Sequence, residues 1–162
     1  MFDEKVRSME ERDIPAVAEM FKALYDHLFE LGALYRLNPD WLDDYLQMML
    51  DSRFGRVLVL DIGAEIAGFI CLSTPLLGKK LIAEGPKNTG FISELYVDPA
   101  HRGRSFAKKL LSAAEDYFIA ANIRNIHVEV LVENEAAASL YKKYGFEPSR
   151  TNYCKKIDGI IT

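Results

Sequence analysis

A group of basic residues stands where a strand-like segment gives way to a long amphipathic helix. Residues 91–97 have the apolar and aromatic composition of a strand, and Asp98-Pro99-Ala100 follows as a turn. The cations that come next are Arg102, Arg104, Lys108 and Lys109. No acidic residue accompanies them before Glu115, although a helix N-terminus carries roughly +0.5 of an elementary charge and favours acids. Because phosphate oxygens suit such a position, we interpret residues 102–108 as a phosphate-binding loop.

Two common phosphate-binding motifs do not fit this segment. A P-loop needs Gly-Lys followed by Ser or Thr, and the chain contains no such sequence. A dinucleotide fingerprint needs three spaced glycines, and only Gly103 is present here. A nucleotide-binding α/β enzyme is therefore the weakest of the alternatives that this loop leaves open.

The loop resembles the acetyl-CoA-binding motif of the GNAT acetyltransferases, Gln/Arg-x-x-Gly-x-Gly/Ala. Arg102 matches the first position and Ala107 the last, and Ser105 stands where the family has its middle glycine. A serine still supplies the backbone N–H that holds a pyrophosphate, but it is strained if the position needs a positive φ.

A second block, residues 134–146, resembles a later motif of the same family. It contains Asn134, an alanine-rich turn, Leu140-Tyr141, two lysines and Gly145-Phe146 at the family's offsets. Taken alone, the block is an N-capped packing helix that stops at a glycine. The two blocks and the strand between them span residues 91–147, and the chain is similar to the GNAT family over this whole stretch.

The resemblance implies a complete acetyl-CoA site. In the family, the strand at 91–97 carries a bulge and splays from the strand at 125–132, and the gap admits the pantetheine arm, which pairs with strand backbone. Pyrophosphate should meet the N–H groups of residues 104–108. The implied cofactor-binding residues are Leu95, Tyr96, Val97, Arg102, Gly103, Arg104, Ser105, Phe106, Ala107, Lys108, Asn134 and Tyr141.

The implied reaction is direct attack of an amine on acetyl-CoA. An alkylammonium has a pKa near 10.4, so its deprotonation costs about 4.6 kcal/mol at neutral pH, and a nearby carboxylate would assist. Glu94 is the best-placed acid, although a half-exposed strand residue explains it equally well. Tyr141 is the candidate proton donor to the departing thiolate, and a buried aromatic with a satisfied hydroxyl is the alternative.

The expected acceptor is an amine-bearing small molecule or a peptide. Acids and aromatics together suit a cationic amine, and the candidate substrate-binding residues are Tyr25, Glu30, Tyr35 and Tyr96. Some of these aromatics fall on apolar helix faces, and for them the plainer interpretation as core residues carries more weight. The competing hypothesis is a non-catalytic acyl-CoA sensor, which would bind acetyl-CoA without acceptor-dependent thiol release.

Composition sets the broader limits. With 162 residues, 49% of them hydrophobic and 27% charged, residues 1–162 are expected to form a single domain. Neither a membrane-spanning run nor a signal peptide is evident, and Cys71 and Cys154 fit reduced thiols, so we expect a cytoplasmic protein. A net charge of -4 argues against nucleic acid. No metal is implied, and dimers among relatives suggest a homodimer.

The elements needed to position these residues form an α/β fold. We expect a mixed, mostly antiparallel sheet with one central parallel, splayed strand pair and flanking helices, the arrangement of the GNAT acyl-CoA N-acyltransferases. A long connection, residues 74–89, precedes the cofactor strand and is expected to be functional. Strands are expected at 6–9, 57–60, 65–72, 91–97, 125–132, 146–148 and 152–156, and helices after Asp13, from Asn38 to about 51, after the basic loop, and at 134–144.

Overall fold

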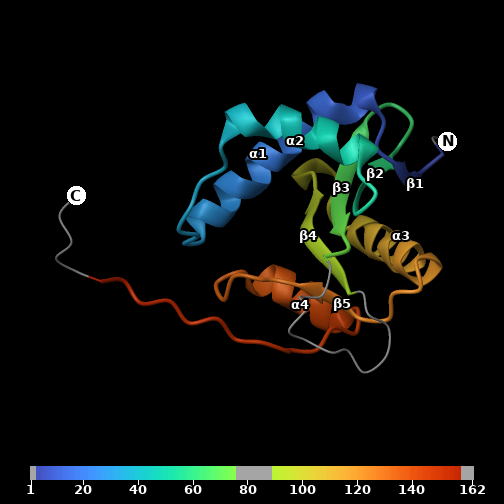
Figure 1. The fold of residues 1–162 in the computed structure, drawn as a ribbon. Helices are drawn as coiled ribbons and strands as arrows, with labels where there is room; N and C mark the ends of the chain where they lie inside the picture. The colour runs from blue at the N-terminus through green and yellow to red at the C-terminus, as the bar shows by residue number, and fades with distance from the viewer. Residues whose placement is uncertain (1–2, 76–88, 158–162) are drawn as a thin grey trace.

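The computed structural model describes residues 3–75 and 89–157. Five strands, four α-helices and two short 3-10 helices appear in this part of the chain (Figure 1). The strands are β1 (Lys5–Ser8), β2 (Gly55–Asp61), β3 (Ile66–Ser73), β4 (Gly90–Val97) and β5 (Ile126–Val128). The helices are η1 (Glu11–Asp13), α1 (Ile14–Glu30), α2 (Pro39–Asp51), η2 (Pro99–His101), α3 (Phe106–Ala120) and α4 (Glu135–Lys143).

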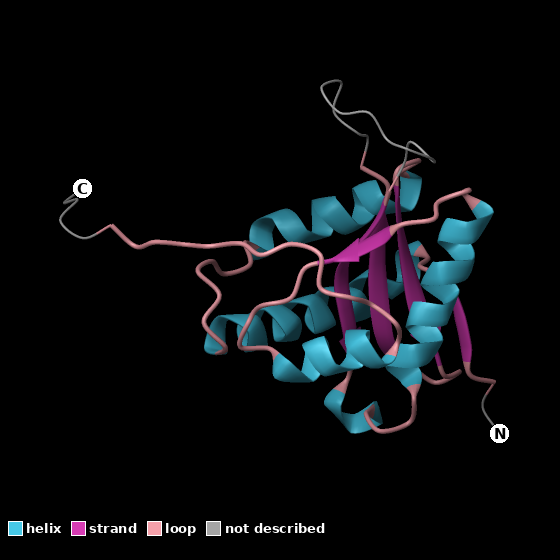
Figure 2. Ribbon diagram, turned by 90° about the horizontal axis from the view of Figure 1, so that it is seen from below, coloured by secondary structure: helices cyan, strands magenta, loops and turns pink. Residues whose placement is uncertain are grey.

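The strands form one sheet in the order β1-β2-β3-β4-β5, with helices on both faces (Figure 2). The first three pairings are antiparallel, and β4 pairs with β5 in parallel. One hydrophobic cluster packs α1 and α2 against one face, and a second packs α3 and α4 against the other. The sequence-based prediction of a mixed, mostly antiparallel sheet with flanking helices and one parallel pair is therefore confirmed.

Local capping signals set the starts of two helices as predicted. The Asn38 side chain accepts a hydrogen bond from the Asp40 N–H at 3.1 Å, and Pro39 opens α2. The Asn134 side chain likewise accepts from the Ala137 N–H at 3.2 Å at the start of α4. Asp13 precedes α1, but its carboxylate makes no cap for that helix.

The end of the sheet differs from the prediction. Instead of spanning 125–132, β5 has only three residues, and the strands expected at 146–148 and 152–156 are absent from the described chain. Residues 151–157 are exposed and run away from the body of the molecule (Figure 1). Pro148 has no N–H for a strand ladder, and the polar residues that follow bury no apolar face. The parallel pair therefore lies at one edge of the described sheet, not at its centre.

Two further findings concern the chain as a whole. Most of the long connection, residues 76–88, lies outside the described residues, so the expectation of a functional loop there is not addressed. No helix within 3–75 and 89–157 combines the length and apolar character that a bilayer crossing requires.

Candidate active site

The basic loop joins the end of β4 to α3 through a fixed turn. The Asp98 N–H donates to the Ala67 carbonyl at 2.9 Å, and the Asp98 carboxylate accepts from the Ala100 N–H at 2.8 Å. After η2, the backbone turns through two left-handed residues, Gly103 at φ +78° and Ser105 at φ +60°. Ser105 thus stands in a conformation that suits glycine, which gives a physical reason for the glycine of the family motif.

The N-terminus of α3 is left available to an anion. Ser105 occupies the N-cap position, yet its side chain makes no cap hydrogen bond. The first helical bond at this end runs from the Lys109 N–H to the Ser105 carbonyl, at 3.1 Å. The amides of Phe106, Ala107 and Lys108 precede it and have no carbonyl one turn earlier in the helix. These three N–H groups can hold phosphate oxygens.

Three of the four cations in this segment have partners within the protein. Arg102 Nε donates to the Val97 carbonyl at 3.1 Å, and Arg104 reaches Glu4 at 3.3 Å. Lys109 also bonds to the Glu4 carboxylate. These ion pairs hold the pKa of Glu4 below its ordinary value, through the Lys109 hydrogen bond above all. The acid that the local sequence lacks is therefore supplied by the N-terminal segment.

The sheet opens beside the second half of β4. The β4–β5 register ends at the pair Ile92 and Val128, whereas β4 continues to Val97. The register with β3 shifts between Cys71, opposite Glu94, and Leu72, opposite Ile92, so Ser93 is the extra residue of a β-bulge. The strand therefore has the predicted bulge, and its edge is free of β5 from this bulge onward.

The backbone of β4 presents hydrogen-bonding groups along this open edge. Because the Asp98 N–H points to β3, the alternation of a strand turns the N–H and C=O groups of Val97 and Leu95 the other way. The contact from Arg102 to the Val97 carbonyl agrees with this direction. An extended amide-bearing arm could pair with these groups as an added strand.

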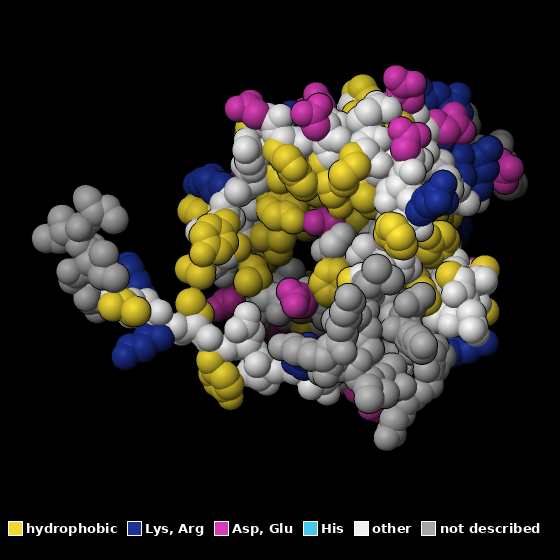
Figure 3. Space-filling view, viewed as in Figure 1, with side chains coloured by type: hydrophobic (Ala, Val, Ile, Leu, Met, Phe, Trp, Pro, Cys, Tyr) yellow, Lys and Arg dark blue, Asp and Glu magenta, His cyan; other side chains and the backbone are white. Residues whose placement is uncertain are grey.

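Glu94 lies at the centre of a polar cluster on the α1–α2 face. Tyr25 Oη of α1 donates to Glu94 Oε1 at 2.8 Å, and Ser93 Oγ donates to Glu94 Oε2 at 2.5 Å. Cys71 of β3, which is buried, stands opposite Glu94 in the strand register, and Tyr45 of α2 packs against the same hydrophobic cluster as Cys71 and Tyr25. This face of the molecule is hollowed below α1 and α2, with hydrophobic and acidic side chains around the hollow (Figure 3).

The neighbours of Glu94 all stay protonated at neutral pH. Burial, followed by the charge of Glu94, raises the pKa of Tyr25 well above its usual range. Burial also raises the pKa of Tyr45, and it raises that of the Cys71 thiol strongly. Both phenols and the thiol therefore carry their protons, and the Tyr25 phenol donates its proton in a hydrogen bond to the carboxylate.

Tyr141 lies on the opposite side of the sheet from Glu94. It is 8% exposed and packs in the cluster between the sheet and α3, together with Leu95, Val97 and Phe106. Its ring meets Phe146 edge-on, with centroids 5.4 Å apart. Burial raises the pKa of Tyr141 to about 12, so its phenol is a proton donor at neutral pH.

The predicted substrate-binding residues divide into two groups. Tyr25 joins the Glu94 cluster, and Tyr96 is buried with its ring 6.3 Å from that of Phe69. Glu30 ends α1, and Tyr35 follows it in the connection to α2; both are exposed, Tyr35 by 82%. Neither forms a hydrogen bond or an ion pair with Glu94 in the part of the chain that the structure describes.

Sequence reasoning did not assign a site role to three members of the cluster, Tyr45, Ser93 and Cys71. Tyr45 occupies an apolar helix face and stacks on Trp41 at 4.3 Å, so its pattern is that of a core residue. Ser93 acquires its position from the bulge, and Cys71 lies in a continuous apolar strand. The one sign of a site role in the sequence is that Tyr45, an aromatic at a core position of its helix, also carries a hydroxyl.

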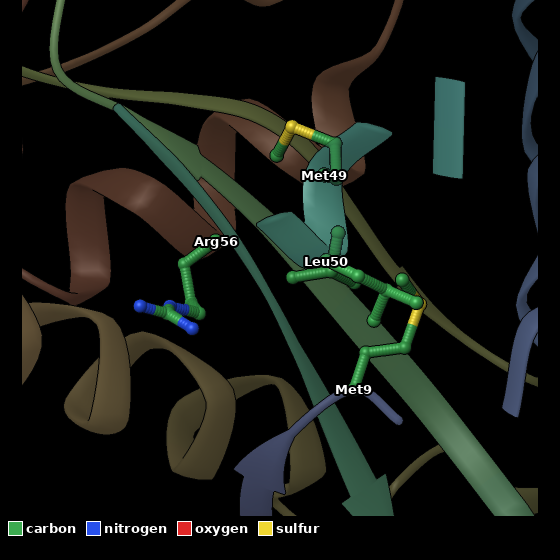
Figure 4. A pocket seen from close by; sticks show the side chains of 5 residues that line it. Met9, Met49, Leu50 and Arg56 are labelled. Atoms are coloured by element: carbon green, nitrogen blue, oxygen red, sulfur yellow. The ribbon is translucent and has the colours of Figure 1, made fainter. Parts of the chain in front are cut away.

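A separate small cavity plays no part in this site. Met9, Met49, Leu50, Arg56 and Val57 line about 10 Å³ of space between α2 and β2 (Figure 4). Such a volume holds at most about one water molecule. We therefore attribute this cavity to imperfect packing around two flexible methionines.

Comparison with known proteins decides the family. The profile of the acetyltransferase (GNAT) family matches residues 17–146, most of the chain. The chain belongs to the GNAT acetyltransferase family. As a member, it is an acetyltransferase whose acyl donor is acetyl-CoA.

Individual relatives agree with this assignment. A Bacillus subtilis protein, provisionally named as an alanine N-acetyltransferase of ribosomal protein bS18, is 26% identical over 140 residues, which is 85% of each chain. The fold of this acetyltransferase matches the BH1408 protein of Bacillus halodurans with a TM-score of 0.83, at 22% identity over 94% and 99% of the two chains. An aminoglycoside N-acetyltransferase in complex with CoA matches with a TM-score of 0.78, at 16% identity over 98% and 97%.

Proposed function

We propose that this acetyltransferase transfers the acetyl group of acetyl-CoA directly to a primary amine of a small molecule or a peptide. The observation that carries the proposal is the position of a carboxylate and a phenol, two groups able to exchange protons, on opposite faces of the opened sheet. Glu94 faces α1 and α2, and Tyr141 lies in the cluster under α3. An acyl donor lying along β4 would have its thioester between them.

The residues around the gap fit acetyl-CoA. The Leu95 and Val97 backbone groups would pair with the pantetheine amides, and a donor from that arm would replace Arg102 at the Val97 carbonyl. The N–H groups of Phe106, Ala107 and Lys108 would hold the pyrophosphate. The Asn134 side chain serves as the cap of α4, so its role toward the cofactor would be to position that helix.

The chemistry then balances in one displacement. The ammonium loses a proton to Glu94, directly or through one water, and the free amine attacks the thioester carbonyl. The new C–N bond forms as the C–S bond breaks, and the thiolate takes the proton of the Tyr141 phenol. The acetylated nitrogen loses its extra proton to water, and solvent returns a proton to the phenolate. Deprotonation costs the amine about 4.6 kcal/mol at neutral pH, so an adjacent carboxylate accelerates the reaction.

An amine acceptor also agrees with the relatives. The Bacillus subtilis relative is named for an alanine of a ribosomal protein, and the structural neighbour acts on aminoglycosides. Both of those substrates carry amines. The acidic first third of this chain, with 12 acidic and six basic residues in 1–54, favours a cationic acceptor.

Release of thiol from acetyl-CoA across a panel of amines and peptides tests the proposal. We expect release that depends on one class of acceptor, and we expect Tyr141→Phe to lower kcat by about 10²-fold with the Kd of CoA nearly unchanged. Tyr144→Phe is the matched control, since it removes a second hydroxyl of the α4 region, 3.3 Å from Glu115. Wild-type turnover in Tyr141→Phe would remove that residue from the mechanism. Tight binding of acetyl-CoA with no acceptor-dependent release would favour a sensor.

A further inference from the structure

The carboxylate of Glu94 is held at both of its oxygens by different elements. Tyr25 of α1 donates a hydrogen bond to Oε1. Ser93, the bulge residue of β4, donates one to Oε2. Tyr45 of α2 packs against the same hydrophobic cluster, which includes Cys71 of β3, the residue opposite Glu94 in the strand register. These four groups are the titratable or polar neighbours of Glu94 from the elements packed around it in the described chain.

The bulge is what allows this double contact. In a regular strand, neighbouring side chains point to opposite faces, so Ser93 and Glu94 would not meet. The extra residue at Ser93 breaks the alternation, and both Ile92 and Leu95 then pack toward α3. Ser93 and Glu94 share the α1–α2 face, where their side chains bond to each other.

Tyr25 is held rigidly enough to fix a partner. Its ring stacks on Phe21 with centroids 6.0 Å apart and planes 5° from parallel, and Phe21 in turn stacks on Phe69 of β3 at 4.8 Å. This aromatic stack connects α1 to the sheet and leaves the Tyr25 hydroxyl pointing at Glu94. A hydroxyl on such a support orients a carboxylate with little loss of its own freedom.

We propose that Tyr25 and Ser93 are positioning residues for acetyl transfer, which fix the Glu94 carboxylate so that a free lone pair faces the acceptor amine. This inference rests on the proposed function. Each carboxylate oxygen has two acceptor sites, and the two hydroxyls occupy one on each oxygen. The remaining sites are available to the ammonium or to a bridging water.

The decisive variant is Tyr25→Phe, which keeps the stacked ring and removes only the donor. We expect kcat to fall by about 3- to 30-fold with little change in the KM of the amine. Ser93→Ala should lower kcat in the same way, again with little change in the KM of the amine. Tyr144→Phe, which removes a tyrosine–glutamate hydrogen bond elsewhere, should leave kcat unchanged.

A second measurement does not depend on turnover. Crystal structures of the wild type and of Tyr25→Phe compare the orientation of the Glu94 carboxylate directly. The expected result is one carboxylate orientation in the wild type and more than one in Tyr25→Phe. A single unchanged orientation in Tyr25→Phe overturns the inference, whether or not the wild type acetylates amines. A released carboxylate in a protein that releases no thiol would sink the proposed function and retain the Tyr25–Glu94 coupling.

Discussion

Ser105 is the residue at which this chain departs from its family and at which its backbone is strained. Its φ of +60° and ψ of +20° lie in the left-handed region, which costs a residue with a Cβ about 1–2 kcal/mol. The Ser105 hydroxyl does not offset this cost with a cap, since it makes no cap hydrogen bond with α3. Replacing Ser105 by glycine should therefore stabilise the protein.

The expected gain follows from two opposing effects. Ser105→Gly removes the strain of about 1–2 kcal/mol, and the freedom of glycine in the unfolded chain takes back about 0.5–1 kcal/mol. The net stabilisation should be about 0.5–1 kcal/mol. In a protein of this size, this change raises Tm by about 1–4 °C.

Thermal unfolding of Ser105→Gly, Ser105→Ala and the wild type provides the assay. Alanine keeps the strain and loses an unused hydroxyl, so we expect it within about 0.5 kcal/mol of the wild type. Calorimetric titration with CoA should show that Ser105→Gly keeps its affinity, since backbone N–H groups bind the pyrophosphate. A Tm of the glycine variant at or below that of the wild type would refute the argument from strain. A loss above about 1 kcal/mol in Ser105→Ala would show that the hydroxyl supports the loop.

Two further predictions concern ion pairs. Glu4→Gln should tighten CoA binding severalfold at low salt, because the Glu4 carboxylate competes with phosphate for Arg104. The gain should be smaller at high salt, which screens this competition. Equal CoA affinities of variant and wild type at low salt would exclude it. The Asp13 carboxylate is buried, which raises its pKa, but hydrogen bonds from Arg7 and the Glu10 amide, at 2.6 and 2.8 Å, bring it below the ordinary value. The unfolded chain then binds a proton more readily than the folded protein does. The stability that the Asp13 carboxylate contributes is therefore present above about pH 4 and is lost as pH falls through the lowered pKa of Asp13. Asp13→Asn should cost about 1–2 kcal/mol in urea unfolding at pH 7 and much less at pH 3; an equal loss at both pH values would contradict the linkage.

Local chemistry made several elements predictable. Asn38 and Asn134 each cap a helix with their own side chains, and both helices begin as predicted. The antiparallel hairpin of β2 and β3 follows from two apolar runs separated by a short turn. These features depend on residues within a few positions of one another, which a sequence displays directly.

Contacts between distant segments were not predictable in this way. Tyr25 and Glu94 are 69 residues apart, and Glu4 and Arg104 are 100 residues apart. Asp13 has the pattern of a helix cap, but its carboxylate bonds to Arg7, whose guanidinium also reaches Asp61 of β2. In each case, the partner is chosen by how helices, loops and strands pack together in the folded chain, which the local pattern does not specify.

The bulge at Ser93 shows why one such non-local feature matters for the whole site. It begins where β4 parts from β5, so it marks the start of the open edge on which acetyl-CoA would lie. It also turns Ser93 to the same face as Glu94, which gives the carboxylate its second hydrogen bond. A regular strand at 90–97 would keep its alternation and lose this pairing. One extra residue thus links the proposed cofactor edge to the proposed base, and the two should be disrupted together by any deletion that restores a regular register.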